Sequence, residues 1–267
     1  MDLLKTIEQR TSIRTFAKDP LTSEDLAVID ETLEEARKRH RPFSTSLAFF
    51  RADAASMKVF PAYGLVKNPR VFIGATTEAS FLAHVDLGYV LQHALLSLCA
   101  YGLGTVWLGA FRLDKRAAGL DEAAHLPALI ALGRKATPSL REKTVKRLSK
   151  GARRKPPEAL FYPLGSHRGL SEETYRTSCL HTPLEALRRA PSSMNSQPWR
   201  VVFTDGAADV HIAKKYGASP SMKAIDAGIG LCHLVLGLQA LWDDVRIERR
   251  EPMDARDFTY VASVRWS

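Results

Sequence analysis

The segment around which this chain is organised reads Arg189-Ala190-Pro191-Ser192-Ser193-Met194-Asn195-Ser196-Gln197-Pro198-Trp199-Arg200. Its two prolines hold φ at about −65°, and the residues between them carry mostly short hydroxyl and carboxamide side chains. A helix is expected before it, with Thr182 as N-cap, Pro183 at the first helical position and Glu185 completing a capping box. A strand over 201–203 is expected after it. The pattern predicts a polar binding loop that a helix and a strand hold rigidly.

The same residues also fit an ordinary surface turn. Prolines often bracket turns whose Ser and Asn side chains hydrogen-bond to their own backbone. On composition alone, such a turn is the more frequent outcome by about two to one. Composition therefore leaves both the binding loop and the ordinary turn open.

Length and composition are those of a globular protein. The chain has 267 residues, of which 45% are hydrophobic and 25% are charged, enough for one large domain or two small ones. The N-terminus lacks the apolar core of a signal peptide, and no run reads as a membrane span, so we expect a cytoplasmic protein. Cys99, Cys179 and Cys232 lack metal-ligand spacing and are interpreted as reduced, so no metal is predicted.

The net charge of +9 is concentrated in one tract near the middle of the chain. Its basic residues are Arg134, Lys135, Arg141, Lys143, Lys146, Arg147, Lys150, Arg153, Arg154 and Lys155. A nucleic-acid-associated protein is one interpretation, but the tract has no interleaved aromatic side chains to stack on bases. We therefore expect solvated surface or a site for one phosphate, and no nucleic-acid partner.

A second candidate site lies near the start of the chain, where Arg10, Ser12 and Arg14 occupy alternate positions. Alternate side chains of an extended segment share a face, so two guanidinium groups and a hydroxyl would converge there. Arginine binds phosphate through charge-assisted, bidentate hydrogen bonds. The motif predicts an anion site, and two solvated arginines are the simpler alternative for so short a pattern.

Hydrophobic periodicity predicts most of the regular structure. A first helix ends at Thr11, and Thr22 caps a second one. The remaining expectations are a long helix over 85–101, strands over 71–73, 102–111 and 127–133, a hairpin of 199–204 with 210–213, and closing strands over 245–249 and 258–266.

The chain also contains an internal repeat. Residues 86–100 align without gaps to residues 226–240, with Asp, Gly, Leu, His, Leu, Leu and Ala shared in register. The repeat predicts two equivalent long helices. Because His93 and His233 lie on otherwise apolar helices, they are interpreted as satisfied contacts at a helix–helix seam and not as catalytic groups.

Three motifs together resemble the nitroreductase family of FMN-binding oxidoreductases. They are A-P-S-S-M-N-S-Q-P-W at 190–199, R-T-S-I-R at 10–14 and G-L-G-T-V-W-L-G at 102–109. The resemblance covers most of the chain and is closest to the single-chain, internally duplicated branch of that family. It implies an α+β fold with mixed and antiparallel sheets and flanking helices. Two homologous halves, 1–157 and 158–267, would form an intramolecular pseudo-dimer.

The resemblance also implies a single site shared by the halves. In homodimeric relatives, the arginine motif and the polar loop come from different chains. Here the arginine motif survives only in the first half, where Arg41-Pro42-Phe43-Ser44-Thr45-Ser46-Leu47 replaces the loop, and the loop survives only in the second. A monomer with one FMN per chain is therefore expected.

The implied cofactor contacts fall into three groups, and no catalytic side chain is assigned. The phosphate and the pyrimidine edge would be held by Arg10, Thr11, Ser12, Arg14, Lys67, Arg153 and Lys155. The backbone of Gly109 and Ala110, after Trp107 and Leu108, would face flavin N5 and O4. The polar loop would contribute Pro191, Ser192, Ser193, Met194, Asn195 and Gln197. The implied activity is NAD(P)H-driven reduction of a nitroaromatic, quinone or related small molecule, and a flavin-binding protein with little turnover is the alternative.

Overall fold

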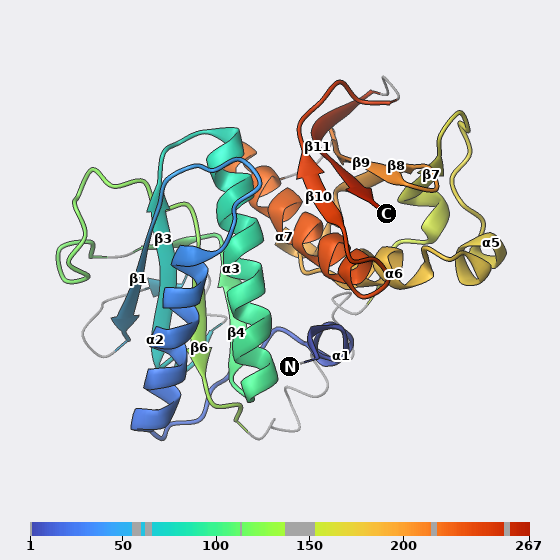
Figure 1. Ribbon diagram of the computed structural model, residues 1–267. Helices are drawn as coiled ribbons and strands as arrows, with labels where there is room; N and C mark the ends of the chain where they lie inside the picture. Colours follow the sequence, from blue (N-terminus) through green and yellow to red (C-terminus); the bar gives the residue numbers. More distant parts are fainter. Residues whose placement is uncertain are drawn as a thin grey trace. The chain divides into compact units, whose positions relative to one another are not determined.

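The computed structural model describes residues 2–54, 60–61, 66–112, 114–136, 153–214, 218–253 and 257–267 (Figure 1). Its chain divides into two compact units, Met1–Ser149 and Lys150–Ser267. This division falls before the expected 157/158 boundary, so Arg153 and Lys155 group with the second unit. The rest of the basic tract, from Arg141 to Lys150, lies outside the described residues.

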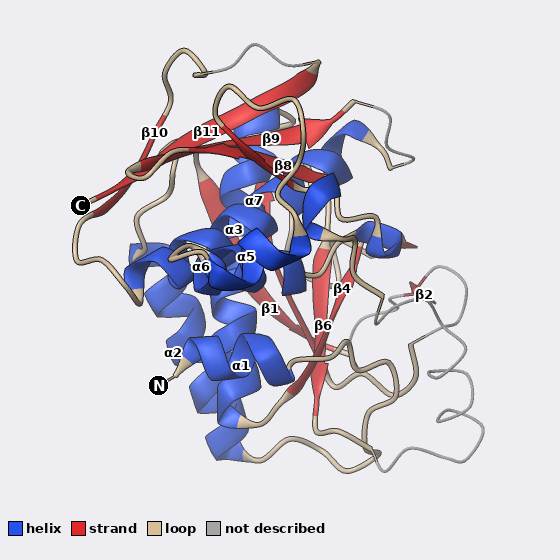
Figure 2. Ribbon diagram, turned by 90° about the vertical axis from the view of Figure 1, so that its right-hand side faces the viewer, coloured by secondary structure: helices blue, strands red, loops and turns tan. Residues whose placement is uncertain are grey.

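Unit 1 is an antiparallel sheet with helices packed against it (Figure 2). Its strands are β1 Leu47–Asp53, β3 Val71–Thr77, β4 Gly104–Leu108 and β6 Leu129–Gly133, in the order β1-β3-β6-β4, with a separate pair of β2 Phe60–Pro61 and β5 Phe111–Arg112. Its helices are α1 Leu3–Gln9, α2 Ser23–Lys38 and α3 Phe81–Tyr101. Helix α3 contacts β3, β4 and α2, so it links the sheet to the outer helix.

Helix α2 begins as the sequence predicts. The Thr22 hydroxyl accepts a hydrogen bond from Asp25 N at 3.2 Å, and the Asp25 carboxylate accepts one from Thr22 N at 2.9 Å. This capping box satisfies N–H groups that an uncapped first turn would leave unpaired. The buried residues Ile29, Leu33 and Ala36 form the predicted apolar stripe.

Unit 2 has a five-stranded mixed sheet. Its strands are β7 Phe161–Pro163, β8 Trp199–Phe203, β9 Ala207–Ala213, β10 Val245–Glu248 and β11 Phe258–Trp266, in the order β10-β11-β9-β8-β7. Only the β7–β8 pair is parallel among these. Its helices are α5 Glu172–Thr177, α6 His181–Arg189 and α7 Pro220–Gln239, with 3₁₀ turns η3 Pro157–Ala159 and η4 Ser193–Asn195. The predicted hairpin and both closing strands are confirmed.

Helix α6 packs closely on α7. A Cβ atom at Gly237 would lie 2.4 Å from Pro183 Cα, so only a glycine lets the two helices approach this far. The predicted capping box at the start of α6 is wrong, because the helix begins at His181 and its N-cap, Leu180, has no side chain that can accept a hydrogen bond. Glu185 instead accepts a hydrogen bond from the Tyr175 hydroxyl at 2.5 Å and pairs with arginines of its own helix.

Helices α3 and α7 are long and apolar enough to cross a membrane by length and composition. Their most apolar windows are 72% and 78% buried within the structure. Burial of that extent is what core helices of a globular unit show, so the hydropathy of these helices is explained by packing.

Candidate functional site

The arginine segment, residues 10–14, leaves α1 in extended conformation and runs beside β4. Ile13 N donates a hydrogen bond to Thr105 O at 2.9 Å. A Cβ atom at Gly104 would lie 3.0 Å from Ile13 Cγ2, so the glycine allows this close contact. Arg10 Nη1 lies 3.5 Å from Ser12 Oγ, to which it donates. The side chains of Arg10 and Ser12 therefore meet on one face, as the alternating pattern predicts.

Lys67 lies next to Arg14. Lys67 N donates to Arg14 O at 2.7 Å, and Phe16 N donates to Lys67 O at 3.0 Å. Both cationic side chains are exposed. Across the described ranges, neither side chain forms a hydrogen bond or ion pair with another residue. The structure thus brings together two predicted site residues that are far apart in sequence, and it leaves their charge uncompensated.

By contrast, the positive charge of Arg134, the first residue of the basic tract, is paired with a carboxylate. Its guanidinium forms a bidentate pair with the Asp25 carboxylate at 3.0 and 2.9 Å. Burial by itself raises the pKa of Asp25, but the hydrogen bond from Thr22 N and the pairing with Arg134 outweigh it, so the pKa is lowered overall. Arg134 is therefore part of the fold, whereas Arg14 and Lys67 remain available to an anion.

The carboxyl end of β4 presents backbone N–H groups. Trp107 Nε1 donates to Gln92 Oε1 of α3 at 2.9 Å, which fixes the indole, and Leu108 is buried. Gly109 and Ala110 follow in an exposed bend. In the described part of the chain, no carbonyl accepts a hydrogen bond from either N–H. Their predicted contact with a flavin therefore stays a prediction, and their exposed backbone is compatible with it.

The polar loop of unit 2, residues 190–199, has strained backbone. Met194, Asn195 and Gln197 have φ values of 53°, 54° and 47°, in the left-handed region that residues with a side chain rarely adopt. Ser193 N donates to both carboxylate oxygens of Asp226 on α7, at 3.1 and 3.0 Å. The loop is therefore a defined structure that is fastened to a core helix, and the ordinary solvated turn does not describe it.

The side chains of the polar loop hold the segment that precedes η3. The amide Nδ2 of Asn195 donates to Arg153 O at 2.9 Å, and Gln197 Oε1 accepts from Lys155 N at 2.8 Å. The guanidinium of Arg154 donates to Asn195 Oδ1 at 2.6 Å. Arg153 and Lys155 thus lie beside the loop within one unit, joined to it mainly through their backbone.

Arg154 and Asp226 are the residues that the sequence interpretation missed. Arg154 also donates to Arg189 O at 3.1 Å, and its pKa is lowered by burial and then by Arg188 and Arg189. Arg154 stands between Arg153 and Lys155, which the sequence motif predicts as phosphate ligands, and nothing in the motif distinguishes it from them. Asp226 had a usable signal, because it aligns with Asp86 in the internal repeat.

The loop residues differ greatly in exposure. Met194 is 93% exposed, whereas Gln197 is 2% exposed. Ser192 Oγ accepts a hydrogen bond from Gln197 N at 2.9 Å. Met194 therefore presents its side chain to solvent, whereas Gln197 acts within the loop.

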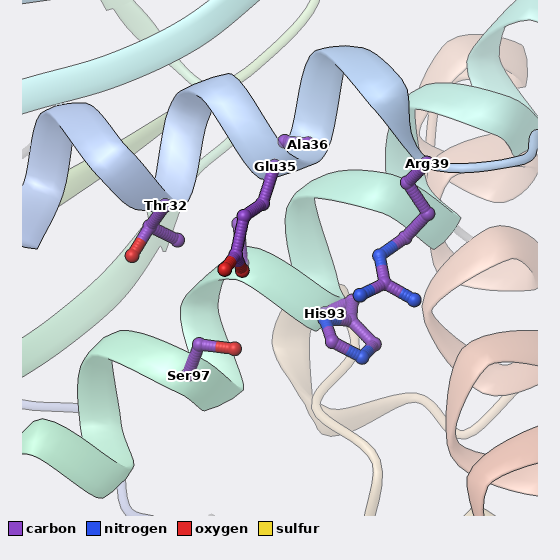
Figure 3. Close-up of a pocket in the computed structure, with 7 residues that line it drawn as sticks. Thr32, Glu35, Ala36, Arg39, His93 and Ser97 are labelled. Carbon is purple, nitrogen blue, oxygen red and sulfur yellow. The ribbon is translucent and has the colours of Figure 1, made fainter.

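His93 lies at the seam between α2 and α3, as expected, beside a narrow indentation (Figure 3). Thr32 and Glu35 of α2 and Arg39, its C-cap residue, line this indentation, and the space is too small for a water molecule. Burial and then the charge of Arg39 lower the pKa of His93 to about 4, so the ring is neutral at pH 7. The matched His233 has Nδ1 2.9 Å from Ala186 O of α6, at the other helix–helix seam.

Metal ligation is not supported in the part of the chain that the structure describes. No three His, Cys, Asp or Glu side chains there form a group that could hold a metal ion. The three cysteines form no disulfide, with Cys232 buried and Cys179 exposed.

Comparison with solved structures identifies the fold. The crystal structure of "a putative nitroreductase" from Thermotoga maritima MSB8 covers 100% of this chain and 94% of its own, with 18% identity and a TM-score of 0.63. A nitroreductase family protein from Clostridium difficile 630 covers 55% of this chain and 92% of its own, with 18% identity and a TM-score of 0.39. A nitroreductase with bound FMN from Bacteroides fragilis NCTC 9343 covers 52% and 91%, with 14% identity and a TM-score of 0.38.

The full-length match to the Thermotoga structure shows that the fold is the nitroreductase-like α+β fold. No curated protein sequence matches the chain. The family described as "Putative TM nitroreductase" matches residues 2–238, which is most of the sequence. This chain therefore belongs to that nitroreductase family.

Proposed function

We propose that this protein is an FMN-dependent oxidoreductase that binds one FMN per chain. The observation that carries the proposal is the uncompensated cationic pair of Arg14 and Lys67 beside the Arg10–Ser12 contact in unit 1. A phosphate monoester is a dianion at neutral pH, and guanidinium and hydroxyl donors on one face suit its oxygens. The residues present in unit 1 fit the phosphate and the pyrimidine edge of FMN.

Each group has a distinct role in this proposal. Arg10 and Ser12 hold the phosphate, while Arg14 and Lys67 place positive charge at the pyrimidine edge of the ring. Gly109 and Ala110 donate backbone N–H groups to the opposite edge. When bound, FMN would supply the redox chemistry, which is hydride transfer between NAD(P)H and a nitroaromatic, quinone or related acceptor. The residues of the chain bind the cofactor, orient it and polarise its ring.

We further propose that the two halves are homologous and that both contribute to one FMN site. Support comes from a backbone feature that both units share. In unit 1, Phe43 N donates to Asp86 of α3 at 2.9 Å, and the next residue, Ser44, has a φ of 55°. In unit 2, Ser193 N donates to Asp226 of α7, and the next residue, Met194, has a φ of 53°. The shared construction supports a common origin of the two loops.

The direct test of flavin binding uses the purified protein. It should be yellow and should release FMN on heat denaturation, with one FMN per chain. A colourless protein that also fails to bind added FMN would contradict the proposal. NAD(P)H oxidation that requires a nitroaromatic or quinone acceptor would establish turnover, whereas flavin binding without it would leave a binding protein.

The oligomeric state provides a second test. Because both halves are linked in one chain, sedimentation should find FMN bound to the monomer. FMN bound only in a dimer would contradict a site that one chain completes.

A further inference from the structure

We propose that Asp226 is a positioning residue for cofactor binding, and that Asp86 performs the same structural task without that role. The inference rests on the proposed FMN function. It concerns a carboxylate that does not touch the cofactor and acts by fixing the shape of the polar loop.

Asp226 is well placed to fix that shape. Its side chain is 1% exposed on α7, and both of its oxygens lie within 3.1 Å of Ser193 N. Hydrogen bonds to an ionised carboxylate are stronger than bonds between neutral groups. The bond holds the residue immediately before Met194 and Asn195, whose left-handed backbone a free chain would rarely adopt. Asp226 therefore stabilises an unfavourable conformation at the residues that the loop presents.

Asp86 supplies an internal control. It is fully buried on α3, and it accepts hydrogen bonds from Phe43 N and Thr45 N, both at 2.9 Å, and from the Thr45 hydroxyl at 2.8 Å. The loop that it fastens has one left-handed residue, Ser44, and lacks the Asn and Gln of the polar loop. The two carboxylates thus have the same chemistry and comparable burial, but only one of them holds a loop with cofactor-binding residues.

The experiment compares Asp226→Asn with Asp86→Asn. Asparagine keeps the shape but loses the negative charge and replaces one acceptor oxygen with an NH₂ donor, so its hydrogen bond to the loop backbone is weaker than that of the carboxylate. Both variants should lose thermal stability. FMN affinity, measured by titration of the folded variants, should fall about tenfold or more in Asp226→Asn and stay within about twofold in Asp86→Asn.

A second variant tests the same bond from the loop side, in case Asp226→Asn does not fold. Ser193→Pro removes the N–H donor, and the site tolerates proline because Ser192 is extended, with φ −146° and ψ 160°, and Ser193 begins a 3₁₀ turn. Ser193→Ala keeps the N–H and removes only the hydroxyl. FMN affinity should fall at least several-fold further in Ser193→Pro than in Ser193→Ala.

A double variant shows whether the two residues act through one bond. Asp226→Asn should add little to the loss already caused by Ser193→Pro, because the bond is already absent. Fully additive losses would contradict positioning through Ser193.

Hydrogen exchange separates this inference from the proposed function. In flavin-free protein, the Ser193 amide should be equally protected in the wild type and in Asp86→Asn, and clearly less protected in Asp226→Asn. If wild-type protein does not bind FMN at all, the proposed function fails. If the wild type binds FMN and the two Asp→Asn variants lose equal affinity, or neither loses any, the positioning role alone is overturned.

Discussion

The arginine segment and the polar loop were predicted to share one task, yet their hydrogen bonding is opposite. In the arginine segment, Arg14 and the neighbouring Lys67 keep exposed cationic side chains without partners among the described residues. In the polar loop, Asn195 and Gln197 are already bonded to the backbone or side chains of residues 153–155. The arginine segment can therefore still bind an anion, whereas the polar loop is held rigid by its own hydrogen bonds.

This difference indicates how each region can take part in binding. An uncompensated charge gains strongly when an anion arrives, so substitutions in the arginine segment should act on affinity. A loop whose carboxamide side chains are already hydrogen-bonded contributes through its shape and through the groups that remain exposed, such as the side chain of Met194. Substitutions of these bonded carboxamide side chains, which leave the backbone anchor at Ser193 in place, should therefore act first on stability and only modestly on affinity.

The largest effect on FMN affinity is expected at Arg10. Arg10→Ala removes a charge-assisted bond to the phosphate, which is worth about 1.5 to 3 kcal/mol, or about tenfold to a hundredfold in affinity. Fluorescence titration with FMN measures it. Unchanged affinity in a folded variant would remove the phosphate assignment and with it the contrast between the two regions.

Gln197→Ala should act on stability. The buried carboxamide accepts from Lys155 N and donates to Arg153 O, which also accepts from Asn195 Nδ2. Its loss leaves Lys155 N without this acceptor and removes one of the two donors to Arg153 O, at a cost of about 1 to 3 kcal/mol in the free energy of unfolding. Denaturant unfolding measures this cost. Met194→Ala is the matched control, because the exposed side chain should change stability by less than about 0.5 kcal/mol. Equal losses in both variants would show that the loop is not held by its internal bonds.

Arg134→Ala tests whether a compensated cation in unit 1 behaves differently from Arg14. It should leave FMN affinity unchanged and destabilise the fold by about 1 to 2 kcal/mol, because Asp25 loses its bidentate partner.

The destabilisation should also depend on pH in a defined direction. The pKa of Asp25 is lowered in the folded state, so the carboxylate contributes stability above its unfolded pKa of about 3.9 and loses it as pH falls through the folded value. The gap in unfolding free energy between wild type and variant should shrink below about pH 4. If the difference in unfolding free energy between wild type and Arg134→Ala does not change with pH, the Asp25–Arg134 ion pair is not the source of that difference.

Of the two proposed cofactor-binding side chains, Arg10 and Asn195, the smaller effect on FMN affinity is expected at Asn195. Asn195→Ala should lower FMN affinity by about 0.5 to 1.5 kcal/mol, the size of a neutral hydrogen bond. A double-mutant cycle with Arg14→Ala should show coupling of about 0.5 kcal/mol or more if both residues serve one site. Strict additivity would count against a site that draws on both halves.

The sequence predicted most of the fold, because long periodic segments carry their own signal. The Thr22 capping box, the helix ending at Tyr101 and the hairpin of β8 and β9 needed no tertiary information. Strand β1 was missed, although its residues alternate between buried and exposed. The α6 capping box was wrong, because a Ser/Thr-Glu spacing also fits a helix that begins two residues earlier and uses its glutamate for ion pairs.

Site residues were harder to predict for a physical reason. Motifs identify which side chains could bind an anion, but partners set whether those side chains remain available. The pairing of Arg134 with Asp25 and the bond of Arg154 to Asn195 join residues far apart in the chain, and no local pattern encodes them. The backbone bridge between Arg14 and Lys67 is of the same kind, and only the folded sheet reveals it.

The anchoring of the polar loop limits how it could be transplanted. Ser193 and its carboxylate partner are 33 residues apart in sequence, so a synthetic peptide of 190–199 would lack the acceptor and return to ordinary right-handed or extended backbone. Grafting the ten-letter motif onto another scaffold would carry the side chains without their geometry. A working graft would have to include an acidic residue on a buried helix beneath the turn.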